Sequence, residues 1–139
     1  MRERIRRLLE CSNGGALVEF AVVAGLILTP LLLGIMEFGF ASWARNTVVS
    51  DAREGARYAI VRGSTSANVA TVDSVRRFVR SKTGLPTSGP DSIRVYAAWP
   101  TGNAPGSFVE VSVAHRVARR GPFLAAHTDS ASSKMVIRF

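Results

Sequence analysis

The stretch from Gly15 to Ala44 constrains this chain most, because it is apolar over a length that can cross a lipid bilayer. It contains 17 consecutive residues without a charge, Phe20 to Met36, and apolar neighbours extend the run on both sides. Thirty residues of helix reach about 45 Å, so such a helix crosses the hydrocarbon core and emerges from it. The sequence therefore predicts a transmembrane helix over residues 15–44.

Two carboxylates and a proline interrupt this apolar stretch. Glu19 lies a few residues inside its start, and Glu37 lies near its end. A carboxylate in apolar surroundings needs a partner or becomes neutral, which makes Glu19 a candidate assembly residue. Its position alone leaves a second interpretation open, in which Glu19 reaches the headgroups at the membrane surface. Pro30 removes one backbone hydrogen bond and predicts a kink in a helix that continues.

Basic residues before the apolar stretch set the expected topology. Four arginines fall within the first seven residues, so the positive-inside rule places the N-terminus in the cytoplasm and the later residues outside it. Cys11 is the sole cysteine, which excludes an intramolecular disulfide and leaves a free cytoplasmic thiol. The net charge of +8 could indicate nucleic acid, but the arginines are dispersed, so we expect no nucleic-acid partner.

The helical pattern continues beyond the apolar stretch as a stalk, residues 45–62. Small residues recur on it at four-residue steps, which lets another element pack closely. We favour packing against the globular part of this same chain, and the alternative is helix–helix packing in a filament. Charged residues share the segment, and Glu54 and Arg57 have the three-residue spacing of a helical ion pair. The stripe consists of Ala44, Val48, Ala52, Ala56 and Ala59 or Ile60.

The remaining residues, 63–139, predict a small α+β head. The turn at residues 63–66 offers N-caps for a short helix with apolar residues from Val69 to Val79, and Gly84 and Pro86 end that helix. Alternating residues over 93–99 and 109–117 predict an antiparallel hairpin, and residues 134–139 predict a final strand. The fold class is thus α+β: a long N-terminal transmembrane helix continuing into a stalk, then a head with a short helix and an antiparallel sheet.

No set of residues in the chain indicates catalysis. His115 and His127 are the only histidines and have no cysteine or carboxylate at ligand spacing, so we expect no metal site. A histidine in a strand, such as His115, is expected to be exposed or half-buried. No phosphate-binding loop or catalytic triad can be identified either. We predict that the protein is not an enzyme and has no cofactor and no small-molecule substrate.

Three segments carry a family likeness: GGALVEF at residues 14–20, GIMEFG at 34–39 and DAREGARYA at 51–59. Together with the intervening apolar span they resemble the TadE-like family, pseudopilins of the bacterial Tad/Flp tight-adherence pilus system. The likeness is dense over residues 14–63. The head resembles the family only in outline.

The resemblance implies an inner-membrane, prepilin-like protein needed for assembly of adhesive pili. A prepilin peptidase of the aspartic type would cut between Gly14 and Gly15, which makes Glu19 the fifth residue of the mature chain. A cut after Gly15, or no cut, is the alternative. Glu19 would pair with the α-amino group of a neighbouring subunit. The implied partners are the membrane, the peptidase and other pilins of the system, including a TadF-like partner. The residues expected at helix-packing contacts are Glu19, Phe20, Pro30, Glu37, Arg53, Glu54 and Arg57.

The expected organisation is a basic leader over 1–14, the transmembrane helix over 15–44, the stalk over 45–62 and the head over 63–139. Two alternatives compete with the pilin interpretation. One is a secreted domain that starts at Arg45 after cleavage at the Ser42-x-Ala44 sequence, against which the helical pattern runs straight across that site. The other is a single-span membrane protein whose head binds an unrelated partner.

Overall fold

A computed structural model describes residues 12–89, 91–118 and 121–137. The predictions for most of the basic leader, including Cys11, and for the last two residues lie outside these ranges. The chain divides into two compact units, Met1–Gly39 and Phe40–Phe139. Each unit is described by itself.

The first unit is helical throughout its described part. It contains α2, Ser12–Val23, then a π-helical turn, η1, Ala24–Leu28, and the beginning of α3, Thr29–Val61. Apolar side chains in unbroken succession allow a helix in a bilayer, because a helix satisfies its own backbone hydrogen bonds. The prediction of a long apolar helix at the N-terminus is confirmed.

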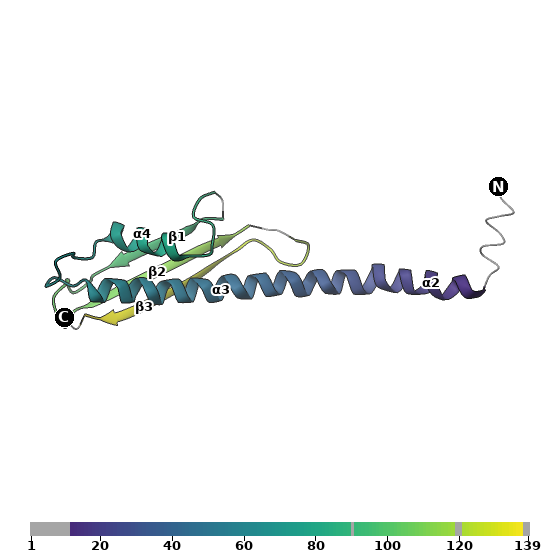
Figure 1. Ribbon diagram of the computed structural model, residues 1–139, viewed down its shortest axis with the longest axis horizontal. Helices are drawn as coiled ribbons and strands as arrows, with labels where there is room; N and C mark the ends of the chain where they lie inside the picture. Colours follow the sequence, from purple (N-terminus) through teal and green to yellow (C-terminus); the bar gives the residue numbers. More distant parts are fainter. Residues whose placement is uncertain (1–11, 90, 119–120, 138–139) are drawn as a thin grey trace. The chain divides into compact units, whose positions relative to one another are not determined.

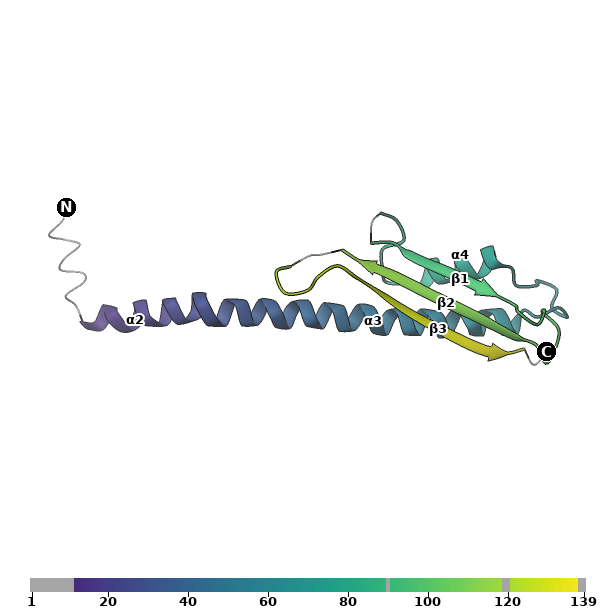
Figure 2. The ribbon, with the colours of Figure 1, turned by 180° about the vertical axis from the view of Figure 1, so that it is seen from behind.

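The second unit combines two helical segments with one sheet. The helical segments are the C-terminal part of α3, from Phe40, and α4, Val72–Lys82. The strands are β1, Ile93–Ala98, β2, Phe108–Val117, and β3, His127–Val136, which form an antiparallel sheet in the order β1-β2-β3. Figures 1 and 2, taken from opposite sides, show α4 and this part of α3 on the same face of the sheet. The predicted α+β class is confirmed.

Helix α4 begins later than the sequence suggested. Its N-cap is Thr71, whose hydroxyl accepts from the backbone N–H of Ser74, while the Ser74 hydroxyl accepts from the backbone N–H of Thr71. The predicted caps in the turn at 63–66 are therefore wrong. The reciprocal pair at Thr71 and Ser74 satisfies the backbone N–H groups of both residues at the start of the helix. The helix ends before Gly84 and Pro86, as predicted.

The hairpin between β1 and β2 is confirmed, with Val95 opposite Val113 and Ala97 opposite Val111. The third strand was predicted too short, because β3 already begins at His127. Its first half, HTDSAS, contains small and polar residues whose alternation carries little hydrophobic signal. Pairing with the valine-rich β2 along ten residues holds this half in the sheet.

The core lies between the helices and the inner face of the sheet. Valines of β2 and α4 and small residues of α3 form it, together with Ile93 and Leu85. The stripe of Ala44, Val48, Ala52, Ala56 and Ala59 is buried here to 0–1% exposure. The favoured interpretation of the stripe, packing against the head of the same chain, is thereby confirmed. The filament alternative for these residues is excluded while the head stays packed.

Candidate functional site: the long helix and its charged continuation

The N-terminal helix exposes its apolar side chains on all sides. The most apolar 18-residue window within Gly14–Val61 has 0% of its residues buried inside the protein. Leu17, Leu26 and Met36 are each more than 70% exposed. Such a surface is stable only in contact with lipid or with other helices, since apolar area in water costs free energy in proportion to its size. Among the described residues, one helix is thus long and apolar enough to span a membrane.

Glu19 lies on this exposed apolar surface. It belongs to α2, as do Gly14, Gly15 and Phe20, and the Phe20 ring is 68% exposed. Within the described part of the chain no hydrogen bond or ion pair involves the Glu19 carboxylate. For a carboxylate without such a partner, nothing compensates the cost of transfer into an apolar medium. A partner for Glu19 would therefore come from outside the described residues, for instance from another molecule or from the membrane surface.

Pro30 falls in the first turn of α3, directly after the π-helical turn. The hydroxyl of Thr29 donates to the backbone carbonyl of Ala24 at 2.9 Å, and the backbone N–H of Thr29 bonds to the same carbonyl. Proline has no N–H to donate, and the wider π-helical turn, with Thr29 bonded back to Ala24, lets the helix continue past this position, as predicted. It is continuous past Glu37, which is half-buried.

At the start of the second unit two aromatic rings follow the apolar segment. Phe40 and Trp43 contact each other with ring centroids 5.4 Å apart, and both rings remain more than 40% exposed. Aromatic side chains with one wet edge are typical of the boundary between hydrocarbon and headgroups. The pair marks where this helix would leave a bilayer.

Gly55 is a point of close approach between α3 and the rest of the core. A Cβ placed on it would lie 2.9 Å from Cγ2 of Val79 in α4 and 3.0 Å from Cγ1 of Val111 in β2. Carbon atoms pack best at about 3.5–4.0 Å, so no larger residue fits without movement. The glycine in the DAREGARYA segment is thus explained by packing, a role that sequence reasoning missed because the neighbours are distant in sequence.

Arg53, Glu54 and Arg57 all point away from the core and are exposed. The predicted ion pair between Glu54 and Arg57 is wrong: among the described residues no such pair lies within 4.0 Å. Exposed pairs of this spacing gain only a few tenths of a kcal/mol, which does not hold two long side chains in place. These three charged side chains are therefore exposed to solvent and able to contact complementary charges of another molecule.

Asp51 is a second residue that sequence reasoning missed. Its side chain is 8% exposed, and burial raises the pKa of its carboxyl above the usual 3.8. A hydrogen bond from Thr83 opposes that pKa shift, and the nearby Glu54 charge adds to it. The Oδ2 atom has no hydrogen-bond partner. A hollow of about 410 Å³, lined among others by Asn46, Lys82 and Glu54, adjoins this carboxyl.

Near the C-terminal end of α3 an aromatic stack joins the two helices. The rings of Tyr58 and Phe78 are stacked with centroids 4.3 Å apart, and the Arg62 guanidinium lies 3.9 Å from the Tyr58 centroid. Contacts of this kind contribute about 0.5–1.5 kcal/mol each. The stack forms one wall of a hollow of about 460 Å³ that Glu54 and Arg57 also line.

One of the two histidines lies differently from the prediction. His115 is 2% exposed on the inner face of the sheet, opposite Asp129, so the expectation of an exposed or half-buried side chain is wrong. It lies opposite Ile93 as well, and the neighbouring strands enclose it. Within the described residues no three His, Cys, Asp or Glu side chains gather closely enough to hold a metal ion.

Comparison with known proteins bears on the same segment. Residues 14–57 match the model of a family described as TadE-like protein. This range contains the apolar helix, Glu19, Asp51, Gly55 and the three exposed charges. No curated protein and no solved structure matches the chain.

Proposed function

We propose that the chain is a membrane-anchored minor pilin or pseudopilin needed for the assembly of Tad/Flp-type adhesive pili. Its TadE-like segment associates it with pilin-like proteins of the Tad pilus, a family that does not consist of enzymes. The single observation that carries the proposal is an apolar helical segment that is exposed on all sides and contains a carboxylate, Glu19, with no hydrogen-bond or ion-pair partner among the described residues. Such a helix suits reversible packing against other helices inside a membrane or a filament.

In this proposal a prepilin peptidase removes the leader 1–14 by cutting between Gly14 and Gly15. The cut creates a free α-amino group four residues before Glu19. In the assembled state this amino group of one subunit pairs with Glu19 of its neighbour, since a buried carboxylate is stable only when it is paired. The pair would fix the axial stagger between adjacent helices. The N-terminus lies in the cytoplasm, the helix spans the inner membrane and the head lies outside.

The partners are other pilins of the same system, including a TadF-like protein. Phe20 and Pro30 would pack against neighbouring helices within the apolar segment, with Glu37 near the segment's end. Arg53, Glu54 and Arg57 would meet charges of a neighbouring subunit beyond the membrane.

The competing secreted domain starting at Arg45 has a structural cost. It would lack Ala44, which is completely buried in the core of the second unit. It would also interrupt α3 inside a regular helix. The competing single-span protein with an unrelated partner needs no peptidase and tolerates loss of the Glu19 charge.

The intact mass and the N-terminal residue of the protein from membranes of its native host test the processing step. A chain that begins at Gly15 is expected, and replacement of Gly14 by leucine should leave the full-length precursor. Normal maturation of that variant would place the cut elsewhere. A wild-type chain that begins at Arg45 would refute the pilin assignment.

Glu19→Gln tests the assembly role while keeping the shape of the side chain. The variant should insert into the membrane at the wild-type level and lose surface pili. Glu110→Gln, the same charge change on the exposed face of the sheet, is the matched control and should assemble normally. Normal piliation of the Glu19 variant would exclude the proposed pairing.

A further inference from the structure

The outer face of the sheet, which faces away from α3 and α4, holds a hollow of about 490 Å³ at one end. Polar and basic side chains line it, and they come from all three strands and from the residues just before β1. The lining includes Ser92, Arg94, Tyr96, Arg116, His127 and Thr128. The hydroxyl groups of Ser92, Tyr96 and Thr128 and the two guanidinium groups are able to donate hydrogen bonds, so the lining suits an anion. The His127 ring adds no donor, because it lies on the inner face of the sheet with Nε2 3.4 Å from Oδ2 of Asp129 and Nδ1 3.1 Å from the carbonyl of Ala125.

The two arginines of the hollow are not paired with a carboxylate of the described residues. In the described part of the chain neither guanidinium has a carboxylate within 4.0 Å. Arg94 pairs with Ala114 across the strands, and Arg116 follows two residues later on the same face, which makes the arginines diagonal neighbours. Side chains so placed are within reach of each other, so two like charges there repel unless an anion lies between them. Asp91 accepts a hydrogen bond from the backbone N–H of Ala118 at 2.9 Å and is not part of the lining.

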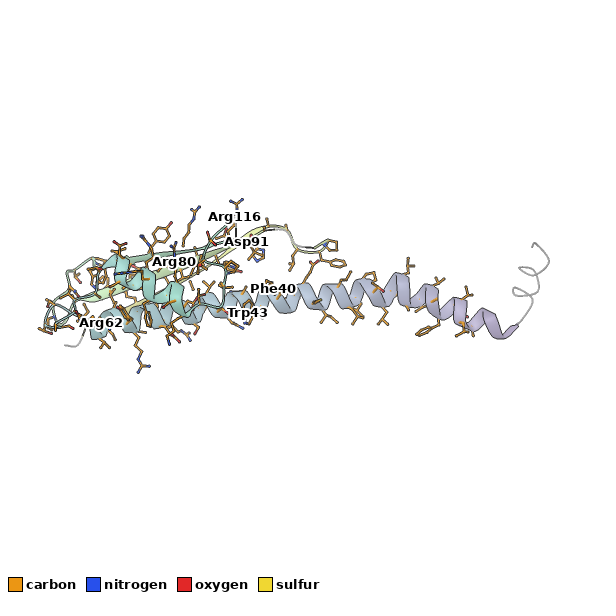
Figure 3. All side chains as sticks on the ribbon, turned by 45° about the horizontal axis from the view of Figure 1, so that its top comes forward. Phe40, Trp43, Arg62, Arg80, Asp91 and Arg116 are labelled. Atoms are coloured by element: carbon orange, nitrogen blue, oxygen red, sulfur yellow. The ribbon has the colours of Figure 1, made fainter. Side chains whose placement is uncertain are left out.

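The hollow lies at the end of the second unit to which the apolar segment is joined. The backbone N–H of Ile93 bonds to the carbonyl of Pro86, and a Cβ on nearby Gly84 would lie 3.5 Å from the ring of Trp43. Figure 3 shows Arg116 toward the same end as Phe40 and Trp43, and Arg62 toward the other end. Phe123, in the loop between β2 and β3, adds a third ring with 55% exposure at this end.

We infer that this hollow binds the phosphate headgroup of anionic membrane lipids. The inference rests on the proposed anchoring of the chain by its apolar helix. Because Phe40 follows that helix directly, the chain itself holds this end of the unit close to the membrane surface. Exposed aromatic rings beside basic residues are suited to the headgroup layer. A guanidinium offers phosphate two parallel hydrogen bonds, which gives geometry as well as charge.

The test uses the full chain in a neutral maltoside detergent. Short-chain phosphatidylglycerol, short-chain phosphatidylcholine and inorganic phosphate are titrated separately, and the backbone amide resonances of residues 92–96, 114–116 and 126–130 are followed. Phosphatidylglycerol should shift these resonances saturably, and the other two probes should not. The double variant Arg94→Gln/Arg116→Gln should bind about thirtyfold more weakly, since each basic residue at an anionic surface contributes about fivefold.

The matched control is Arg77→Gln/Arg80→Gln, which removes two exposed charges from α4 and should bind like the wild type. A charge-conserving pair, Arg94→Lys/Arg116→Lys, should bind with intermediate affinity and secures the result if the glutamine pair disturbs the sheet. Equal shifts with phosphatidylcholine, or with inorganic phosphate, would overturn the lipid assignment. Equal weakening by the control pair would overturn the location. In either case the chain would still be anchored and could still assemble, so the proposed function would stand.

Discussion

Replacing Gly55 with alanine places one methyl group between α4 and β2. The new Cβ would lie 2.9 Å from Cγ2 of Val79 and 3.0 Å from Cγ1 of Val111, where about 3.5–4.0 Å is optimal. Val79 and Val111 are β-branched and essentially without exposed surface, so neither has a free rotamer that relieves the contact. The helix α3 would have to move away from two elements at once.

Two opposing effects set the magnitude. Overpacking of a well-packed core costs about 1–3 kcal/mol. Alanine in place of glycine inside a helix gains about 1 kcal/mol, because the unfolded chain loses less backbone entropy on folding. Gly55→Ala should therefore lower the free energy of unfolding of the second unit by about 1 kcal/mol. A substitution that helix propensity alone would make favourable thus becomes unfavourable.

The assay is urea unfolding of the full chain in a non-ionic detergent, followed by tryptophan fluorescence, since Trp43 and Trp99 both belong to the second unit. A double-mutant cycle with Val79→Ala isolates the contact, because that change removes the nearer methyl group. In the Val79→Ala background the same glycine substitution should be neutral or stabilising, with a coupling of about 1–2 kcal/mol. Gly39→Ala, with open space around the new Cβ, should leave this transition unchanged. Equal effects of Gly55→Ala in both backgrounds would refute the packing role.

Three further predictions concern the same helix and its surroundings. Burial raises the pKa of Asp51 above 3.8, so the folded protein binds this proton more tightly and its stability falls as the pH rises from 3.8 through the raised pKa. Asp51→Asn should remove that decline. A difference in urea midpoint between wild type and variant that is the same at every pH would contradict this prediction. Thr71→Ala should cost about 1 kcal/mol by removing the cap of α4, whereas Thr65→Ala in the turn once expected to supply the cap should cost nothing measurable. Arg57→Glu should change the stability of the second unit by less than about 0.5 kcal/mol, because the side chain is exposed, yet reduce the number of surface pili; Arg77→Glu on α4 is the control, and wild-type piliation of the Arg57 variant would exclude an assembly role.

The local order of this chain could be read from its sequence. The apolar run predicted the long helix, and strict alternation around Val95 and Val111 predicted the hairpin, because both signals come from residues close in sequence. The small-residue stripe predicted which side of α3 packs on the head. The match over residues 14–57 falls in the part of the chain with the densest family likeness.

Features that depend on distant neighbours could not be read in the same way. The first half of β3 lacks apolar alternation and is held by its pairing with β2. The burial of His115 depends on its neighbours in β1 and β3, and that of Asp51 on the residues that follow α4, such as Thr83. Gly55 looked like a simple interruption of helix propensity, since nothing in the sequence places Val79 and Val111 beside it. The hollow with Arg94 and Arg116 likewise follows from the register of β1 and β2.

The helix of the TadE-like segment therefore has two surfaces with different roles. Its small residues, from Ala44 to Ala59, are buried inside the protein, so another molecule cannot pack on them unless the head detaches from α3. In the proposed assembly, contacts between subunits would be made by the apolar segment with Glu19 and by the exposed charges of Arg53, Glu54 and Arg57. These two kinds of contact respond differently to salt: exposed charges are screened at moderate ionic strength, whereas apolar packing with a buried pair is not. If both hold the assembled state, salt should loosen the stalks of neighbouring subunits before it separates their membrane helices.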